Sequence, residues 1–268
     1  MDFAPLIPGQ LQTYIYNTEE EYYKDYQRSY YAITTKKGGW DCMRHYEILA
    51  NGCIPYFVDL ENCDLNTMSL LPRDLILEAM HLDGVSYLHI DHSKFDKKKY
   101  QQILDKLLLY TKQHLSTKAL AQRLLDSLHY SGQGKILFLS YNPEPDYMRC
   151  SLLIGLKQLL GSRIVDVPRI PHIYTNYKEN IQNLYGKGIT YTKIVKDQTV
   201  DRNNILKRIL NKEFELIIYG SVHRGLLFHD VVRKTYPNSQ IAYVCGEDFH
   251  HCEYAHFPNL FLREFEAL

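Results

Sequence analysis

The sequence predicts an α/β protein built from two Rossmann-like domains that face each other across a cleft. Apolar segments alternate with segments of helical periodicity along the 268-residue chain, which is the pattern of parallel sheets covered by helices on both faces. The stretch "YSGQGK" at residues 130–135 has the composition of a linker, and the alternation starts again after it. We therefore expect one domain at residues 1–130 and another at residues 135–268.

In the first half, the element boundaries follow from periodicity and capping residues. Thr18 begins a helix, and Glu21 three residues later completes a capping box. Asp41 is the expected N-cap of a second helix, and Pro72 lies in the first turn of a third. The predicted strands are residues 11–17, 30–34, 53–60 and 85–91, and the predicted helices are 18–29, 41–51, 71–82 and 95–128, the last broken near Ser116.

The second half repeats the alternation of strand and helix. In open parallel sheets, ligands bind at the carboxyl ends of the strands, so candidate functional residues of this half should lie in the loops that follow its strands. The predicted strands are residues 135–142, 163–169, 214–221 and 240–248, and the predicted helices are 147–160, 201–212 and 225–235.

Composition argues against several classes of function. Lys+Arg and Asp+Glu each number 31, so the formal net charge is zero, whereas nucleic-acid-binding proteins carry a basic excess. We expect no signal peptide in "MDFAPLIPGQ", and no apolar run reaches the ~18 residues of a membrane span. Scattered cysteines are typical of free thiols in a reducing cytosol. The expected location is cytoplasmic.

The stretch "RHYEILANGCIPYF" at residues 44–57 has the pattern of a helix that turns into a buried strand. It resembles the nucleotide-sugar-binding motif of GT-B glycosyltransferases, particularly of the exostosin family. That family has an arginine, two residues, a glutamate and then a Gly-Cys-Ile-Pro turn, matched here by Arg44, Glu47 and residues 52–55. Leu71–Pro72 match its later helix start. The resemblance extends over most of the first half.

Physical chemistry supports a diphosphate site at the start of this helix. Helix N-termini offer free N–H groups and partial positive charge to phosphates, and Arg44 adds a bidentate clamp. Glu47, about one turn further along the same face, suits a ribose diol. In the preceding loop, Lys36 or Lys37 can neutralise phosphate charge, and Gly39 lets the backbone approach. The alternative for Arg44 and Glu47 is an exposed ion pair.

The order of the two halves departs from the family pattern. In GT-B enzymes the acceptor-side domain comes first, whereas here the donor-like half leads. The chain is either a circular permutant of a GT-B enzyme or a donor-binding domain fused to a different Rossmann domain. Permutation is physically reasonable because the termini of such domains often lie close together. Acceptor-side residues are therefore chosen by position and not by motif.

An inverting transferase needs one base near the acceptor hydroxyl. The loops after the strands of the second half supply Asp146 in "NPEPDYMR", His223 in "GSVHRG" and Asp248 in "CGEDFHHCEYAH". Asp146 is the first choice because it lies on the first loop of the domain. The alternatives are that Asp146 caps the following helix and that His223 forms hydrogen bonds within a turn.

The resemblance implies a glycosyltransferase, a hexosyl- or pentosyltransferase, that moves a sugar from a nucleotide-sugar donor to a hydroxyl of a glycan acceptor with inversion. It requires no cofactor and no divalent metal. The alternative is an inactive GT-B-like module that binds a glycan or a protein. Methyltransferases and P-loop kinases are discounted because "KILFLS" is followed by "YNPEPDYM", which lacks glycine. No metal site is expected, since Cys245, His250, Cys252 and His256 fit no standard zinc spacing.

Overall fold

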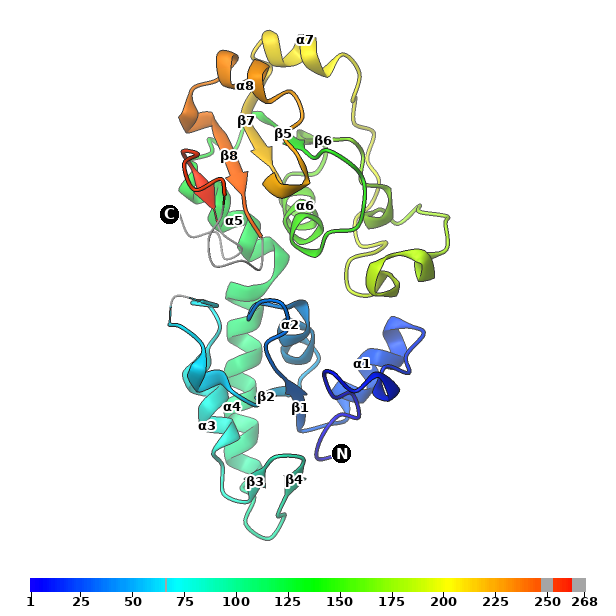
Figure 1. Ribbon diagram of the computed structural model, residues 1–268, viewed down its shortest axis with the longest axis vertical. Coiled ribbons are helices and arrows are strands. Elements are labelled where there is room, and N and C mark those ends of the chain that lie inside the picture. The colour runs from blue at the N-terminus through cyan, green and yellow to red at the C-terminus, as the bar shows by residue number, and fades with distance from the viewer. Residues whose placement is uncertain (66, 247–252, 262–268) are drawn as a thin grey trace. The chain divides into compact units, whose positions relative to one another are not determined.

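The computed structural model describes residues 1–65, 67–246 and 253–261. The chain divides into two compact units, Met1–Ser116 and Thr117–Leu268 (Figure 1). The division lies ahead of the stretch 130–135, which the sequence indicated as the linker. The reason is that helix α5 (Thr117–Ser127) packs along α6 (Tyr147–Leu160) of the second unit.

The first unit is built around a short parallel sheet. In chain order its helices and strands are α1 (Glu19–Gln27), β1 (Tyr31–Thr34), α2 (Met43–Ala50), β2 (Ile54–Phe57), α3 (Arg73–Met80), β3 (Val85–Ser86), β4 (His89–Ile90) and α4 (Lys97–Tyr110). β1 and β2 pair in parallel, with Tyr31 opposite Ile54 and Thr34 opposite Phe57, and α2 connects them. A π-helical turn, Thr111–Leu115, continues α4 up to the break at Ser116 that the sequence predicted.

Helix α2 ends in a Schellman motif, which explains the "GCIP" turn. Gly52, with a φ of +74°, donates its N–H to the carbonyl of Leu49, and Cys53 donates to that of Ile48. A positive φ is accessible to glycine without steric cost. The turn therefore reverses the chain directly from the helix into β2, and the predicted helix-to-strand junction is confirmed.

The capping box of α1 is also confirmed. Thr18 accepts a hydrogen bond from the backbone N–H of Glu21, and the Glu21 carboxylate accepts one from the backbone N–H of Thr18. These two bonds satisfy donors that a helix start leaves unpaired. Pro72, by contrast, occupies the N-cap position of α3 and not its first turn.

Three local predictions for the first half are wrong. Residues 11–17 contain a 3-10 turn and irregular chain, and Leu11 stays exposed because no strand among the described residues covers it. The apolar run at 85–91 folds into an antiparallel hairpin, since Leu88 takes a positive φ between β3 and β4. Asp41 is not the N-cap of α2. Its carboxylate accepts the Tyr46 hydroxyl at 2.7 Å, and Cys42 occupies the cap position.

A five-stranded parallel sheet forms the second unit. The strands are β5 (Lys135–Leu139), β6 (Ile164–Val167), β7 (Phe214–Tyr219), β8 (Ile241–Val244) and β9 (Leu260–Phe261), and the remaining helices are α7 (Ile205–Leu210) and α8 (His229–Thr235). The spatial order is β6-β5-β7-β8-β9, so the connections change direction between β5 and β7. The α/β class is confirmed, although β9 was not predicted.

Both faces of this sheet are buried, which explains why its strands are mainly apolar, with exceptions such as Asp166 in β6 and Glu215 in β7. Ile136 and Phe138 belong to the core layer of α5 and α6, whereas Leu137 and Leu139 belong to that of α7 and α8. Alternate side chains of a strand point to opposite faces. Each such side chain contributes about 1.5–3 kcal/mol when it is fully buried.

A buried ion network holds the long irregular segment between β6 and α7. The Asp166 carboxylate, fully buried, accepts from Lys157 at 2.8 Å, from Arg202 at 2.6 Å and from the Tyr174 hydroxyl at 2.8 Å. Arg202 also donates to the Asp166 backbone carbonyl. Removing one partner would leave an uncompensated buried charge. The network therefore fastens the segment to the edge strand β6.

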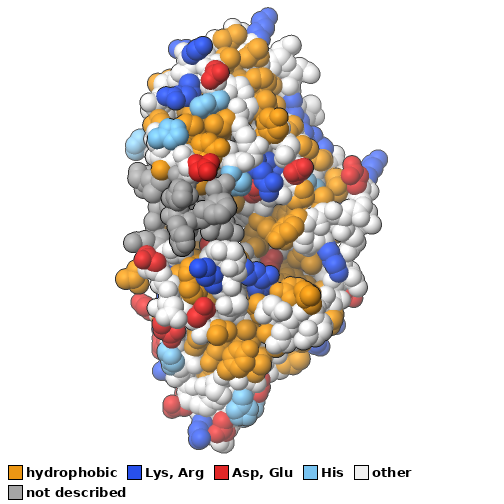
Figure 2. All heavy atoms as spheres, viewed as in Figure 1, with side chains coloured by type: hydrophobic (Ala, Val, Ile, Leu, Met, Phe, Trp, Pro, Cys, Tyr) orange, Lys and Arg blue, Asp and Glu red, His pale blue; other side chains and the backbone are white. Residues whose placement is uncertain are grey.

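Charges of both signs share the surface. On the face drawn in Figure 2, Lys and Arg side chains are interspersed with Asp and Glu side chains, in keeping with the equal totals of 31. Among the described residues, no helix has the length and apolar character needed to cross a membrane.

Gly155 sets the spacing between α5 and α6. A Cβ at this position would lie 1.9 Å from the backbone oxygen of Thr117, so a larger residue forces the helices apart. We expect Gly155→Ala to lower the free energy of unfolding by about 1–3 kcal/mol, measured by urea denaturation. Lys118→Ala, at an exposed position of α5, should change it by less than about 0.5 kcal/mol. Equal losses in both variants would contradict this packing.

Candidate functional site

The junction between β1 and α2 lies where the sequence places the diphosphate. β1 ends at Thr34 and α2 begins at Met43, so the N-terminus of the helix lies at the carboxyl end of the strand. At this edge of a parallel sheet, free backbone N–H groups can meet an anion. The five donor-site residues expected from the sequence all lie in this loop or on α2: Lys36, Lys37, Gly39, Arg44 and Glu47.

His45 fixes the conformation of the loop between β1 and α2. Its Nε2 lies 2.8 Å from the carbonyl oxygen of Trp40 and its Nδ1 lies 2.9 Å from the Thr34 hydroxyl. Nε2 must donate to the carbonyl, so Nδ1 accepts from the hydroxyl. Burial, reinforced by the charge of Arg44, lowers the pKa of His45 to about 4. The ring is therefore neutral at pH 7 and joins the end of β1 to the loop.

Arg44 is a buried cation that uses only part of its hydrogen-bonding capacity. The residue is 9% exposed, and its Nη2 donates to the Tyr14 hydroxyl at 3.2 Å. Its Nε and Nη1 are buried and have no hydrogen-bond partner among the described residues. A buried donor without a partner costs about 1–3 kcal/mol, and more when it is charged. Burial also excludes the alternative of an exposed Arg44–Glu47 pair.

Two further cations lie on the same loop, each beside an aromatic ring. The Lys37 ammonium lies 5.4 Å from the centroid of the Tyr14 ring, and that of Lys36 lies 5.9 Å from the Trp40 ring. Tyr14 is therefore contacted by both Lys37 and Arg44. Both lysines are exposed, so they remain available to an anion that reaches Arg44.

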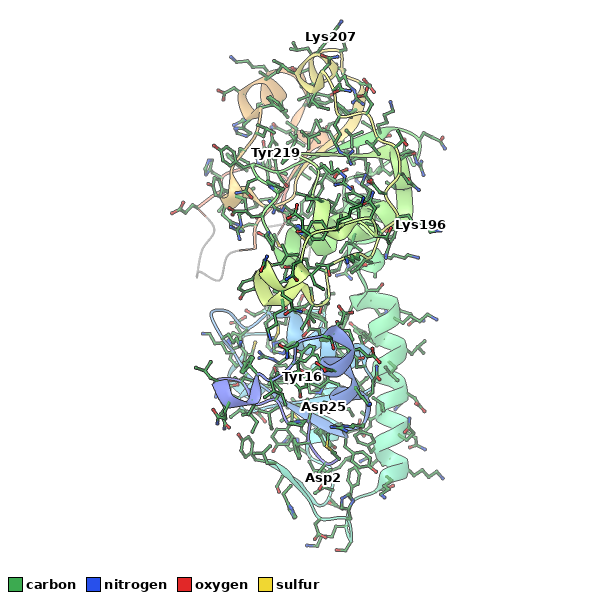
Figure 3. All side chains as sticks on the ribbon, turned by 90° about the vertical axis from the view of Figure 1, so that its right-hand side faces the viewer. Asp2, Tyr16, Asp25, Lys196, Lys207 and Tyr219 are labelled. Atoms are coloured by element: carbon green, nitrogen blue, oxygen red, sulfur yellow. The ribbon has the colours of Figure 1, made fainter. Side chains whose placement is uncertain are left out.

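The segment that carries Tyr14 is fastened to α1. The Tyr16 hydroxyl donates to Asp25 at 2.5 Å, and both residues are labelled in Figure 3. Burial and the adjacent Asp25 carboxylate raise the pKa of Tyr16 well above its usual range, so the hydroxyl keeps its proton. This bond holds the irregular chain at 14–17 in place without a strand.

Glu47 faces α1 through a chain of hydroxyls. The residue is 8% exposed, and its Oε2 accepts from Tyr22 at 2.7 Å, whose hydroxyl accepts from Tyr26 at 2.9 Å. Burial raises the pKa of both tyrosines far above the usual range. Since an ionised carboxylate offers about four lone-pair sites, the bond from Tyr22 is compatible with further acceptor bonds. A ribose contact at Glu47 stays a prediction.

In the second unit, candidate residues gather at the carboxyl ends of β5 and β7. These strands flank the point where the sheet connections change direction, which is where ligands bind in doubly wound sheets. Arg149, fully buried on α6, donates to the carbonyl oxygens of Asn142 and Glu144. The loop after β5 is therefore held from beneath by a buried guanidinium.

Asp146 is the hub of this region. As N-cap of α6, its Oδ1 accepts the backbone N–H of Arg149 at 3.1 Å. Its Oδ2 accepts from the Ser221 hydroxyl at 3.2 Å and from Arg224 Nε at 3.1 Å, and lies 3.7 Å from His223 Nε2. Burial by itself would raise the pKa of Asp146, but the bonds from His223 and Arg149, with the nearby arginine charges, hold it well below its usual range.

This environment makes Asp146 a weak proton acceptor. A general base works best with a pKa near the operating pH and with a free lone pair, and both carboxylate oxygens of Asp146 are engaged. The capping role, which the sequence left as the alternative, is confirmed. The structure brings His223 to the same cluster, where its imidazole is partly exposed. Asp248 lies outside the described residues.

The contact between Cys150 and His172 and the possible metal ligands are further candidates for a functional site. Cys150 and His172 lie 3.3 Å apart, but burial raises the pKa of the thiol to about 12, and burial with the Arg149 charge lowers that of the imidazole to about 4. Both are therefore neutral. Among residues 1–65, 67–246 and 253–261, no three His, Cys, Asp or Glu side chains gather in a way that could hold a metal ion. His250 and Cys252 lie outside this part of the chain.

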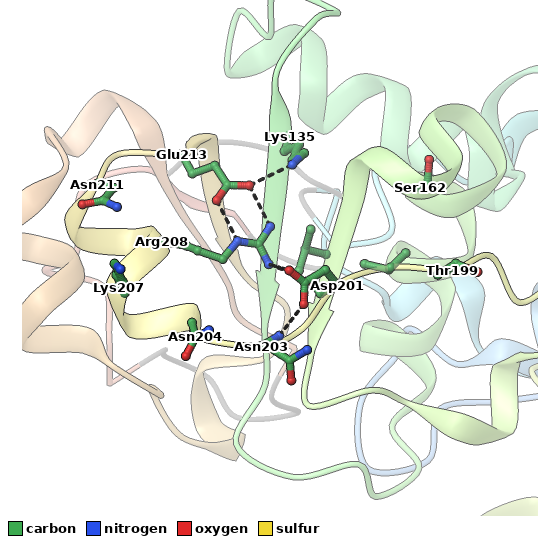
Figure 4. A pocket seen from close by; sticks show the side chains of 12 residues that line it. Lys135, Ser162, Thr199, Asp201, Asn203, Asn204, Lys207, Arg208, Asn211 and Glu213 are labelled. Carbon is green, nitrogen blue, oxygen red and sulfur yellow. Dashed lines mark hydrogen bonds and ion pairs between the residues drawn. The ribbon is translucent and has the colours of Figure 1, made fainter.

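A cavity of about 510 Å³ opens at the amino ends of β5 and β7 (Figure 4). Glu213 accepts two hydrogen bonds from Arg208, at 2.8 and 2.9 Å, and one from Lys135 at 2.8 Å. Asp201, whose carboxylate lies 3.9 Å from Arg208, is a second anion, so two cations face two carboxylates in this network. Ligands are expected at the carboxyl ends of the strands, and the cavity lies at the opposite edge of the sheet.

Several residues around the candidate sites were not identified from the sequence. Tyr14 contacts Arg44, and Tyr22 contacts Glu47. The contact of Tyr14 could not be foreseen because residues 11–17 were predicted to form a strand. Tyr141 lies two residues after the end of β5 and is 65% exposed. The position of an aromatic residue just after a buried strand could have identified it.

Comparison with known proteins identifies no relative, since no protein-family model, no curated protein and no solved structure matches the chain. The sites are therefore interpreted from their own geometry and chemistry.

We expect His45 to make stability depend on pH. Its folded pKa of about 4 lies below the unfolded value of about 6.5, so the unfolded state binds more protons between these values. Stability is therefore complete above pH ~6.5 and falls as the pH drops towards 4. Between pH 7.5 and 5 the loss due to His45 should be about 2 kcal/mol, measured by urea denaturation.

The matched comparison uses one buried and one exposed histidine. His45→Gln should make the loss between pH 7.5 and 5 smaller by that amount, while His172 continues to contribute because burial holds its pKa at about 4 as well. His81→Gln, at an exposed position, should leave the pH dependence unchanged. An unchanged slope in His45→Gln would show that His45 is protonated in the folded protein.

Asp146 should stabilise the fold with the opposite pH dependence. Its folded pKa lies below the unfolded value of about 3.9, so its contribution is present above that value and is lost as the pH falls below it. We expect Asp146→Asn to lower the free energy of unfolding at pH 7 by about 2–4 kcal/mol, with a smaller difference at pH 3. Asp230→Asn, at an exposed position of α8, is the control. If the stability difference between wild type and Asp146→Asn does not depend on pH, Asp146 is not held ionised by its neighbours.

Proposed function

We propose that the protein is a glycosyltransferase that moves a sugar from a nucleotide-sugar donor to a hydroxyl of a glycan acceptor. The observation that carries this proposal is Arg44, a buried guanidinium with two unused donors at the start of α2. It lies at the edge of the sheet where phosphates bind. The motif that follows it, Glu47 and the "GCIP" turn, is the one that resembles the exostosin family.

The energetics of Arg44 favour a ligand with negative charge. A folded protein that contains an unpaired buried cation is less stable than it could be, and such defects are retained where function needs them. A diphosphate would supply acceptors to Nε and Nη1. During transfer, negative charge grows on the departing nucleoside diphosphate, and fixed donors in a buried site stabilise it most. Lys36 and Lys37 add positive charge from the loop.

The remaining donor-side roles follow the same geometry. Gly39 lies in the loop that approaches the phosphates, where its carbonyl accepts the N–H of Lys37 at 3.1 Å. Glu47 would accept hydrogen bonds from the ribose hydroxyls while Tyr22 keeps the carboxylate in place. In this proposal no divalent metal is needed, because the arginine, the lysines and the helix N-terminus neutralise the leaving group.

On the acceptor side, the proposed base is His223, oriented by Asp146. The acceptor oxygen attacks the anomeric carbon, the bond to the diphosphate breaks, and the proton of the acceptor hydroxyl moves to the base. A single displacement of this kind inverts the configuration. The proposal includes a GT-B-like pair of Rossmann-like domains with permuted order. The other possibility, an inactive module, is an outcome of the test below.

Replacing Arg44 should abolish donor binding but raise the stability of the protein without ligand. We expect the melting temperature of the wild-type protein to rise with one of UDP-glucose, UDP-galactose, UDP-N-acetylglucosamine, GDP-mannose or GDP-fucose, by mass action. Arg44→Met should melt at a higher temperature than wild type without ligand, since it removes an unpaired buried charge, and should show no shift with donor. Arg44→Lys, which keeps the charge but loses the fork, should show a reduced shift.

The control is Lys98→Met, which removes an exposed cation from α4 of the same unit and should keep the full donor shift. A full shift in Arg44→Met would place the diphosphate elsewhere. No shift with any donor in the folded wild-type protein would refute the transferase and leave the non-catalytic module. Release of nucleoside diphosphate in the presence of a glycan then separates transfer from binding alone.

A further inference from the structure

We propose that the second unit binds a pyranose ring of a glycan at the carboxyl ends of β5 and β7, with Tyr141 as the stacking surface and the Asp146 cluster as the partner of its hydroxyls. The acceptor role of this sugar rests on the proposed function, but the binding itself does not. The claim concerns a neutral sugar ring, whichever larger molecule carries it.

Tyr141 is an exposed aromatic residue that the fold supports from below. It is 65% exposed and lies two residues after the end of β5. Gly225, with a φ of +107°, lies so close that a Cβ there would be 2.8 Å from Cγ of the Tyr141 ring and 3.0 Å from Cδ2. The ring therefore rests on the backbone of the loop after β7. Only glycine combines this φ with this close approach.

The loop that carries Tyr141 is rigid for a reason unrelated to the tyrosine itself. Arg149, fully buried, donates to the carbonyls of Asn142 and Glu144, and Asp146 caps α6 at the end of the loop. A buried arginine that spends its donors on two carbonyls of one loop fixes the conformation of that loop. An exposed ring on a fixed loop loses little entropy on binding.

The polar Asp146 cluster adjoins Gly225, on which the Tyr141 ring rests. Arg224, next to Gly225 in sequence, donates to Asp146 at 3.1 Å, and His223 and Ser221 complete the cluster. Its partly exposed members, His223 and Arg224, offer hydrogen-bonding groups beside an aromatic surface. A pyranose presents the matching chemistry, with an apolar C–H face for the ring and hydroxyls along its edge.

The charges of the cluster select a neutral ligand. The Arg224 guanidinium is already compensated by the Asp146 carboxylate, to which it is hydrogen-bonded. A phosphate or a nucleic acid strand would find no uncompensated cation in this pair, unlike at Arg44. Nucleotides also stack on aromatic rings, but their binding depends on positive charge along the backbone. A neutral sugar fits both the ring and the charge balance.

The test measures sugar binding by the full chain without any nucleotide. The probes are the methyl glycosides of glucose, galactose, mannose, N-acetylglucosamine and xylose, observed by saturation-transfer NMR. We expect saturable binding of at least one probe to the wild-type protein. Tyr141→Ala should weaken that binding about tenfold, whereas Tyr141→Phe, which keeps the ring, should retain it within about twofold.

Tyr87→Ala is the matched control, since Tyr87 is a half-exposed tyrosine at the β3–β4 hairpin of the first unit, and it should bind as wild type. Because Tyr141 is exposed, the melting temperature of Tyr141→Ala should stay unchanged. The proposal is overturned if none of the five probes binds wild type, or if Tyr141→Ala binds as wild type. Sugar binding without a donor shift would refute the transferase alone. A donor shift without sugar binding would refute this site alone.

Discussion

Parallel strand pairing is the constraint on which both candidate sites depend. A strand that runs parallel to its neighbour needs a crossover connection, and in this chain α2 supplies one between β1 and β2, and α6 begins another after β5. Each helix therefore starts beside the carboxyl end of the strand before it. This geometry places the loops at 35–42 and 140–146. The first contains Lys36, Lys37 and Gly39, and the second ends at Asp146. At the opposite edge of the second sheet, Lys135 and Arg208 beside the cavity are already paired with carboxylates.

Three arginines show how differently the same side chain can be used. Arg202 forms an ion pair with Asp166 and fastens a long loop. Arg149 donates to two backbone carbonyls and shapes the loop after β5, and only its Nε lacks a partner among the described residues. Arg44 has Tyr14 as a partner for one nitrogen and leaves the other two without any among the described residues. Since an unpaired buried donor is destabilising, the two unpartnered nitrogens of Arg44 are the basis on which we propose it as a binding residue.

Asp146, the first candidate for the base, also has a structural role in the second unit. Asp146 was chosen because it lies on the first loop, and the structure places it at the centre of a hydrogen-bonded cluster as an N-cap. The same bonds that hold the carboxylate ionised make it reluctant to accept a proton. His223 lies in the loop after β7, whose residues Ser221 and Arg224 are 75 and 78 residues from Asp146 in the chain. Its imidazole is partly exposed. Convergence of two distant loops on one carboxylate depends on the strand order β5 next to β7.

The sequence by itself determined the α/β class, most helices and strands, the "GCIP" reversal and the loops in which the candidate residues lie, because periodicity, caps and glycine positions act over a few residues. It could not determine the hairpin at 85–90, the irregular chain at 11–17, or the place of α5 with the second unit, since these follow from which surfaces become covered. Likewise it named Arg44 and Asp146 but not their states. Whether a guanidinium keeps unused donors, or a carboxylate is engaged on both oxygens, is decided by neighbours that are distant in sequence, and only the tertiary structure brings those neighbours together.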